Sequence, residues 1–240
     1  MPRRKPKQSS SRSQFKPRVP KSENKHNFQK TERYVKQVEG KTDNQKDYIY
    51  AIMDSEIVFC TGPAGCGKSY IAAGMAAKYL FDKEYDQIIV TRPLVCTGKD
   101  VGSLPGELAE KINPYLTPMQ ENLKHFLGSD YYGLFINERK IRFEPLEMMR
   151  GATFNNSIMI LDEAQNCTLE QIKMFVTRIG KNSKVLINGD IKQSDIKGKS
   201  GLETCINKIS SISEIAVCRL TYDDIQRNDL IYKFIRAIEE

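Results

Sequence analysis

The stretch Ile57-Val-Phe-Cys-Thr-Gly62-Pro-Ala-Gly-Cys-Gly-Lys-Ser69 decides the fold. It opens with the apolar run Ile57–Cys60, which is typical of a buried strand, and an alanine-rich helical stretch follows it. Between them lies the pattern G-x-x-x-x-G-K-[ST]. Glycines let backbone N–H groups converge on phosphate oxygens without Cβ clashes, and the helix N-terminus adds partial positive charge. The stretch therefore predicts a strand, a phosphate-binding loop and a helix.

The chemistry of the loop side chains points to a nucleoside triphosphate, ATP or a close relative. Lys68 is expected to reach the β- and γ-phosphates, and the Ser69 hydroxyl is expected to ligate Mg²⁺, a cation that prefers oxygen. The residues predicted to bind the nucleotide in this loop are Gly62, Pro63, Ala64, Gly65, Cys66, Gly67, Lys68, Ser69 and Tyr70.

A second apolar run, Ile158–Leu161, ends in the two carboxylates Asp162 and Glu163. In an open α/β sheet, ligands bind at the carboxyl ends of the strands. We expect Asp162 to hold Mg²⁺, directly or through water, and Glu163 to polarise the attacking water. A water-activating acid favours hydrolysis over transfer to a substrate hydroxyl. The alternative is a helix N-cap with a first-turn acid.

A third apolar run, Val185–Asn188, is followed by Gly189-Asp190 and then by Gln193. Gln193 is placed to contact the γ-phosphate or the water and so to report the nucleotide state. The alternative is a simple turn built on Gly189-Asp190.

Strand-like and helical stretches alternate along the chain, which predicts a three-layer α/β fold of the RecA-like P-loop type with a mostly parallel central sheet. The predicted strands are Ile57–Cys60, Gln87–Thr91, Ser157–Leu161, Lys184–Asn188 and Glu214–Leu220. The predicted helices are 68–81, 104–127, 168–179, 201–209 and 228–239. Ser129–Met149 interrupts the alternation and reads as a hairpin or an inserted flap, or else as an ordinary edge element.

Positive charge is concentrated at the N-terminus. Of the 37 Lys and Arg residues, 12 lie in residues 1–36, whereas only two of the 30 Asp and Glu residues do. This segment has few apolar residues, so we expect residues 1–40 to be a disordered basic tail and 41–240 to be one folded domain. Such a tail attracts polyphosphate, or it only keeps the protein soluble. It has no apolar region typical of a secretory signal, and no stretch is apolar enough for a membrane span.

The six cysteines include no C-x-x-C pair and have no nearby histidine. They are expected to be reduced core thiols, which favours a cytoplasmic protein.

Together these segments resemble the PhoH-like ATPases, a branch of the P-loop proteins related to superfamily 1 helicases. The shared motifs, in family order over residues 43–240, are Gly62–Ser69, Val90-Thr-Arg-Pro93, Gly102-x-Leu-Pro-Gly106, Glu144-Pro-Leu146, Met149-Arg-Gly-x-Thr-Phe154, Leu161-Asp-Glu-Ala-Gln-Asn166, Thr177-Arg-Ile-Gly180 and Gly189-Asp-x-x-Gln193. The short chain with its basic tail resembles stand-alone family members, including those encoded by bacteriophages. For a phage protein the expected location is the host cytoplasm.

The resemblance implies further roles. Gln45 resembles the glutamine that pairs with adenine in helicase-type ATPases, although Asn44 and Gln45 could merely start a helix. Gln165 resembles the position that couples nucleotide to nucleic acid. One RecA-like domain lacks the cation that a second domain supplies, so we expect an oligomer, such as a ring, in which a neighbour contributes Arg227 or, second, Arg178. Each arginine could instead make a surface ion pair.

Two functions remain open from the sequence. The first is an ATPase that remodels RNA or single-stranded DNA in a helicase-like manner; the slightly acidic composition of the body weighs against a broad basic groove. The second is a nucleotide-dependent switch or assembly protein with little turnover. A small-molecule kinase fits poorly because of Glu163.

Overall fold

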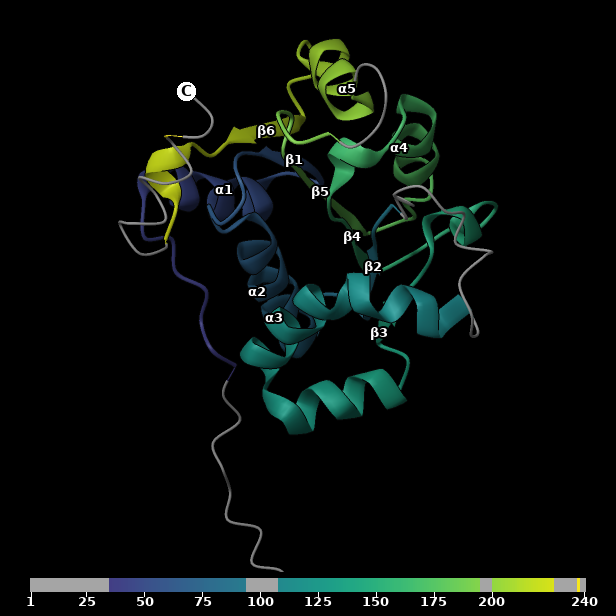
Figure 1. Cartoon of the computed structure of the whole chain (residues 1–240). Helices are drawn as coiled ribbons and strands as arrows, with labels where there is room; N and C mark the ends of the chain where they lie inside the picture. The colour runs from purple at the N-terminus through teal and green to yellow at the C-terminus, as the bar shows by residue number, and fades with distance from the viewer. Residues whose placement is uncertain (1–34, 94–107, 195–199, 227–236, 238–240) are drawn as a thin grey trace, which may run out of the picture. The chain divides into compact units, whose positions relative to one another are not determined.

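A computed structural model describes residues 35–93, 108–194, 200–226 and 237, and the side chains of 108–114 are not included. Its centre is a six-stranded sheet in the order β3-β2-β4-β5-β1-β6, and every pairing is parallel (Figure 1). The strands are β1 (Ile57–Thr61), β2 (Gln87–Thr91), β3 (Ile141–Phe143), β4 (Ser157–Leu161), β5 (Lys184–Gly189) and β6 (Ile215–Arg219). The five predicted strands are therefore present.

The helices of the described residues cover both faces of the sheet, so the predicted three-layer α/β fold is confirmed (Figure 1). They are α1 (Asp43–Asp54), α2 (Lys68–Phe81), α3 (Leu108–Asn137), α4 (Leu169–Val176) and α5 (Gly201–Ile209). Successive strand residues point to opposite faces. Val58 and Cys60 accordingly pack with α1, α2 and α3, whereas Phe59 packs with α4 and α5.

The expectation of a hairpin or flap at Ser129–Met149 is wrong. Helix α3 continues through this region to Asn137, with a change of direction at Gly128, whose φ is 74°. The chain then returns as β3, which pairs with β2 as an ordinary edge strand. Phe135 is buried, and the Tyr131 ring packs edge-on against Phe81. These aromatic side chains are used to pack the helix layer.

The folded body begins before residue 41, the boundary expected from the sequence. Val35 and Val38 pack against the cluster formed with α1 and α2, and the Lys36 backbone N–H donates to the Phe126 carbonyl. Residues 1–34 lie outside the described residues, as do Cys96 and, apart from residue 237, the predicted helix 228–239. Among the described helices, none combines the length and apolar character that crossing a bilayer requires.

Candidate nucleotide-binding site

The predicted phosphate loop and the two predicted acids meet at the carboxyl edge of the sheet. The Ser69 hydroxyl donates to Asp162 Oδ1 at 2.7 Å. This contact spans strand β5, which lies between β4 and β1 in the sheet. The edge position follows from parallel pairing, because every strand then ends on the same side. The hydroxyl and carboxylate expected to bind Mg²⁺ are thus already adjacent.

The loop needs its glycines where the sequence has them. Gly65 and Gly67 have φ values of 85° and 96°, a region that side chains with a Cβ rarely adopt. Gly67 is also the N-cap of α2. A Cβ on Gly62 would lie 2.6 Å from the backbone oxygen of Leu220, which follows β6. The glycines therefore let the backbone take this path, which a side chain with a Cβ would obstruct.

Lys68 lies inside its own loop. Its ammonium donates to the carbonyl of Gly62 at 2.6 Å and to that of Pro63 at 2.9 Å, and it lies 3.6 Å from Cys66 Sγ. An ammonium has three donors on a flexible stem, so phosphate oxygens can replace these carbonyls without movement of the backbone.

Asp162 sits in an unusual electrostatic environment. Burial raises the pKa of its carboxyl group, and the neighbouring negative charge of Glu163 raises it further. The hydrogen bond from Ser69 and the charges of Arg92 and Lys68 act in the opposite direction but do not cancel this effect. A buried carboxylate next to a second acid gains strongly from a nearby cation, as a metal ligand does.

Glu163 is held in place by contacts that were not predicted. Its backbone is left-handed, with φ 55° and ψ 40°. Its Oε1 lies 3.0 Å from a guanidinium nitrogen of Arg92, and its Oε2 accepts a hydrogen bond from Gln165 Nε2 at 2.6 Å. Arg92 directly follows β2 within the motif Val90–Pro93. Its position at a strand end is the sequence feature that could have predicted its place in this site.

Gln165 connects this acid to the loop after β5. Its Oε1 accepts the Asp190 backbone N–H at 2.9 Å. Asp190 also organises a turn, since its Oδ1 accepts the N–H of Lys192 and its carbonyl accepts the N–H of Gln193. The turn expected as an alternative is therefore present. The Gln193 side chain is exposed, and its contact with phosphate stays a prediction.

Gln45 is a helix-capping residue in this structure. Its Oε1 accepts the backbone N–H groups of Lys41 and Thr42, completing a capping box at the start of α1. Its Nε2 donates to the carbonyls of Cys66 and Asp224, each at 3.0 Å. The side chain is buried and ties the phosphate loop to two distant segments. Its predicted contact with adenine remains a prediction.

A pocket of about 270 Å³ lies beside this glutamine and the phosphate loop. It is lined by Glu39, Lys41, Gln45, Gly65, Gly67, Tyr70, Ile71 and Gln226. Tyr70 is 39% exposed, and its other neighbours include the ring of Phe126. A flat aromatic side chain next to the phosphate loop suits a nucleotide base.

Comparison with known proteins agrees with this geometry. The family model described as "PhoH-like protein" matches residues 37–239. The chain belongs to the PhoH-like family. It is 41% identical over 207 residues to the PhoH-like protein of Bacillus subtilis strain 168, covering 85% of this chain and 65% of that protein. It is 40% identical over 201 residues to the protein PhoH of Escherichia coli K12, covering 82% of this chain and 57% of that one.

This chain thus spans less than two thirds of the length of these PhoH-like relatives. Among solved structures, the large terminase of a thermophilic bacteriophage aligns with a TM-score of 0.51 at 11% identity, over 81% of this chain and 49% of that one. That likeness supports the fold. Family membership and the assembled loop make this a P-loop domain of the PhoH-like family.

The structure describes only one of the two arginines that are predicted to act on a neighbouring subunit. Arg227 lies outside the described residues. Arg178 follows α4 at the amino edge of the sheet, opposite the phosphate loop. All three of its guanidinium nitrogens donate within the chain, to the carbonyls of Met174 and Ala152 and to the Thr177 hydroxyl. Acting on a neighbour would require releasing these bonds.

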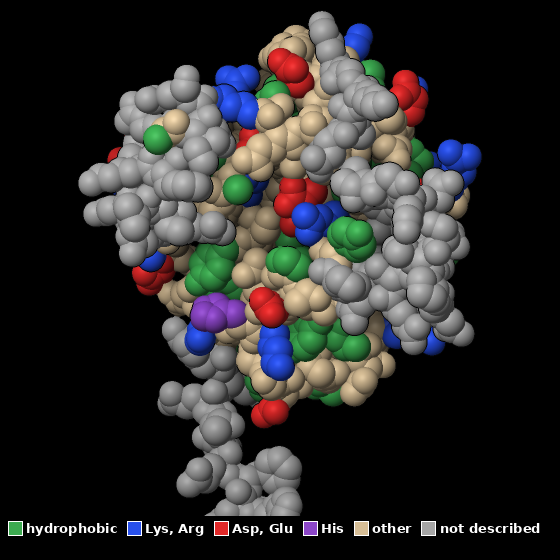
Figure 2. All heavy atoms as spheres, viewed as in Figure 1, with side chains coloured by type: hydrophobic (Ala, Val, Ile, Leu, Met, Phe, Trp, Pro, Cys, Tyr) green, Lys and Arg blue, Asp and Glu red, His purple; other side chains and the backbone are tan. Residues whose placement is uncertain are grey.

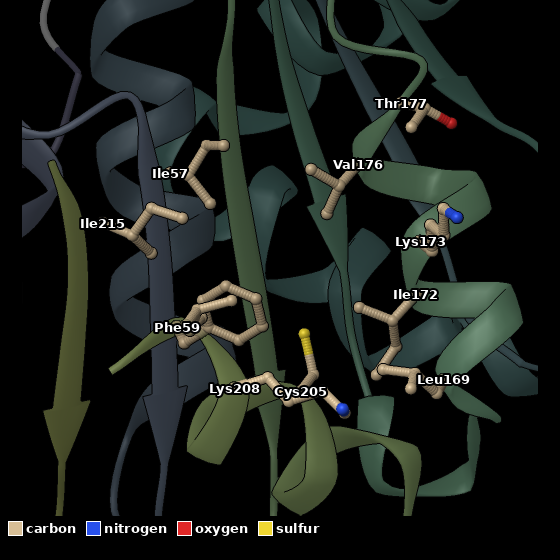
Figure 3. A pocket seen from close by; sticks show the side chains of 11 residues that line it. Ile57, Phe59, Leu169, Ile172, Lys173, Val176, Thr177, Cys205, Lys208 and Ile215 are labelled. Carbon is tan, nitrogen blue, oxygen red and sulfur yellow. The ribbon is translucent and has the colours of Figure 1, made fainter. Parts of the chain in front are cut away.

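A second pocket, of about 300 Å³, lies on the sheet face that carries α4 and α5 (Figure 3). Its walls include Phe59, Ile172 and Ile215, whose side chains point into it, with Lys173 and Lys208 also lining it. It contains no residue of the phosphate loop and neither predicted acid. It is therefore separate from the nucleotide site of this PhoH-like domain.

Proposed function

We propose that this protein binds ATP with Mg²⁺, hydrolyses it, and couples hydrolysis to binding or remodelling of RNA or single-stranded DNA. The observation that carries the proposal is the contact of Ser69 with Asp162, with Glu163 directly after it. A phosphate loop, a metal-ligand pair and a water-activating acid lie at one edge of one sheet.

The residues fit Mg²⁺ and a triphosphate on structural grounds. Ser69 and Asp162 offer two hard oxygen ligands, which is the donor set that Mg²⁺ prefers. When bound, Mg²⁺ would neutralise charge on the phosphate oxygens. The open backbone of the loop and the ammonium of Lys68 would hold the phosphates, and the pocket beside Tyr70 would take the base.

The chain's own residues supply the rest of the chemistry. Lys68 would stabilise negative charge as it develops on the transferred phosphoryl group. Glu163 would accept a proton from the attacking water, which gains nucleophilicity as the proton leaves. Gln165 links Glu163 to the turn at Asp190, so a displacement of that turn would also shift the Glu163 carboxylate.

Coupling to nucleic acid is supported by helicase-like motif order and by the basic N-terminal segment. The described part of the face in Figure 2 shows Lys and Arg side chains scattered among Asp and Glu, without a broad basic area. Binding of nucleic acid would therefore depend on local contacts and on the basic N-terminal segment. Free thiols at the five described cysteines suit a cytoplasmic location.

The experiment is an ATPase assay with and without poly(U) RNA and single-stranded DNA, beside a nucleotide-binding titration. We expect Lys68→Ala to lose nucleotide binding. Glu163→Gln should keep binding and lose about 10²- to 10⁴-fold in kcat. Glu144→Gln is the matched control, because Glu144 pairs with Arg142 at the β3 edge. Full turnover by Glu163→Gln would refute the hydrolytic role of this acid.

The same assay distinguishes the proposed function from the alternative function. A protein that binds ATP, turns it over very slowly and ignores RNA and DNA would be a nucleotide-dependent switch or assembly protein. The oligomer proposal has its own test: if Arg227→Ala and Arg178→Ala both hydrolyse ATP at the unmodified rate, neither arginine acts in trans.

A further inference from the structure

Both carboxylate oxygens of Glu163 already have partners. Arg92 lies 3.0 Å from Oε1, and Gln165 Nε2 donates to Oε2 at 2.6 Å. A general base must present a lone pair to the proton that it accepts. In the conformation described here, donors from the protein face both oxygens of this acid. Each oxygen keeps a second lone pair for a proton, but the two contacts together fix the direction in which the carboxylate faces. The acid can therefore be turned toward an attacking water only if at least one contact is given up.

The Gln165 contact is firmly anchored. Gln165 is 3% exposed, and its Oε1 accepts the Asp190 N–H. Its backbone carbonyl also accepts the hydroxyls of Ser194 and Ser200. Moving the side-chain amide would break its bond to Asp190, and the bonds from the two serines hold the Gln165 backbone in place. Of the two contacts to Glu163, the one from Gln165 is therefore the harder to break.

The Arg92 contact is the one that can be exchanged. The side chains of Arg92 and Glu163 are 24% and 36% exposed, so solvent and ligands reach the pair. A second guanidinium nitrogen of Arg92 donates to the Tyr115 carbonyl at 2.8 Å, an exposed contact. A partly exposed ion pair is weak, and an oxyanion can compete for the guanidinium, which binds phosphate well.

We propose that Arg92 restrains Glu163 in the resting protein and releases it when a phosphodiester group of single-stranded nucleic acid takes its place on the guanidinium. This inference rests on the proposed function and specifies how the nucleic acid reaches the active site. Arg92 is thus a positioning residue, because it acts through Glu163.

The test measures kcat and KM for ATP with and without poly(U) RNA in the wild type, Arg92→Ala and Arg92→Lys. Arg92→Ala should raise the RNA-free kcat by about fivefold, the scale of one partly exposed ion pair. Its KM should stay unchanged and its stimulation by RNA should fall to about onefold. Arg92→Lys keeps a cation and should restore much of the restraint and of the stimulation.

Arg142→Ala is the matched control, because it breaks a similarly exposed Arg–Glu pair away from the site, with Glu144. It should leave both rates at the wild-type values. Thermal unfolding of every variant separates a folding defect from a change in catalysis.

An RNA-free kcat that falls or stays the same in Arg92→Ala, or RNA stimulation equal to that of the wild type, would overturn the inference while leaving the proposed function intact. A wild-type protein that RNA does not stimulate would overturn the nucleic-acid part of the proposed function and the release step together. Inactivity of the wild type without and with RNA would instead refute the ATPase itself.

Discussion

Replacing Gln45 with glutamate tests the structural role of this side chain almost without changing its shape. The carboxylate keeps an acceptor for the N–H groups of Lys41 and Thr42. It loses both N–H donors, so the carbonyls of Cys66 and Asp224 would face an acceptor instead of a donor. The substitution therefore removes the tie to the phosphate loop and spares the helix cap.

The expected cost follows from burial. Gln45 is 3% exposed, so water cannot replace the lost donors. A buried acceptor that loses its partner costs about 1 to 3 kcal/mol, and two are affected. Protonation of the new carboxyl would return one donor. We therefore expect the free energy of unfolding to fall by about 2 to 4 kcal/mol, or about 4 to 16 °C in Tm for a domain of this size.

The assay is equilibrium unfolding in urea, with Gln171→Glu as the matched control. Gln171 occupies the same position of a second capping box, with Thr168 at the start of α4, and its contacts there are exposed. Glutamate is common at this position, so the control should change stability by less than about 0.5 kcal/mol.

Equal stabilities for the two variants would refute the reasoning, because they would show that the bonds from Gln45 to the phosphate loop contribute nothing beyond the cap. A titration with ATP and GTP adds a second readout. Loss of preference for ATP in Gln45→Glu would support the predicted contact with adenine.

Three further predictions concern the surroundings of the site. Gly62→Ala should lower both stability, by about 1 to 3 kcal/mol, and affinity for a fluorescent ATP analogue, because the new Cβ would lie 2.6 Å from the Leu220 carbonyl; unchanged affinity would contradict this. Tyr48→Phe should cost about 1 to 3 kcal/mol in urea unfolding, because the buried Asn188 Oδ1 loses its donor at 2.7 Å; a neutral result would mean that the carboxamide finds another partner. Burial acts to raise the pKa of Asp224, but hydrogen bonds from neighbouring backbone and side-chain groups outweigh this effect and lower the pKa below 3.8. The Asp224 carboxylate therefore stabilises the fold above that pH, and this contribution is lost as the pH falls further. The stability difference between wild type and Asp224→Asn should accordingly stay constant down to about pH 4 and shrink as the pH falls further, and a difference independent of pH over that acid range would rule this out.

Much of the fold was predictable because its signals are local. Apolar runs at β1, β2, β4, β5 and β6 identified the strands, and glycine spacing identified the loop. The error at Ser129–Met149 has a physical cause. Gly128 turns the chain within α3, and the aromatic side chains after it pack against the helix layer. This bend interrupts the helical pattern of apolar residues, and the interruption was interpreted as an insertion.

The sequence by itself determined the phosphate loop, the strand ending in Asp162 and Glu163, and their common edge, since parallel strands end on one side of a sheet. Only the tertiary structure decided which partners these groups meet. Ser69 reaches Asp162 over a separation of 93 residues, and Gln45 reaches Asp224 over 179. The ion pair of Arg92 with Glu163 likewise depends on β2 and β4 being neighbours. Local residue patterns specify elements, but the pairing of distant elements arises from packing the whole core, and the contact of Arg92 with Glu163 arises with it.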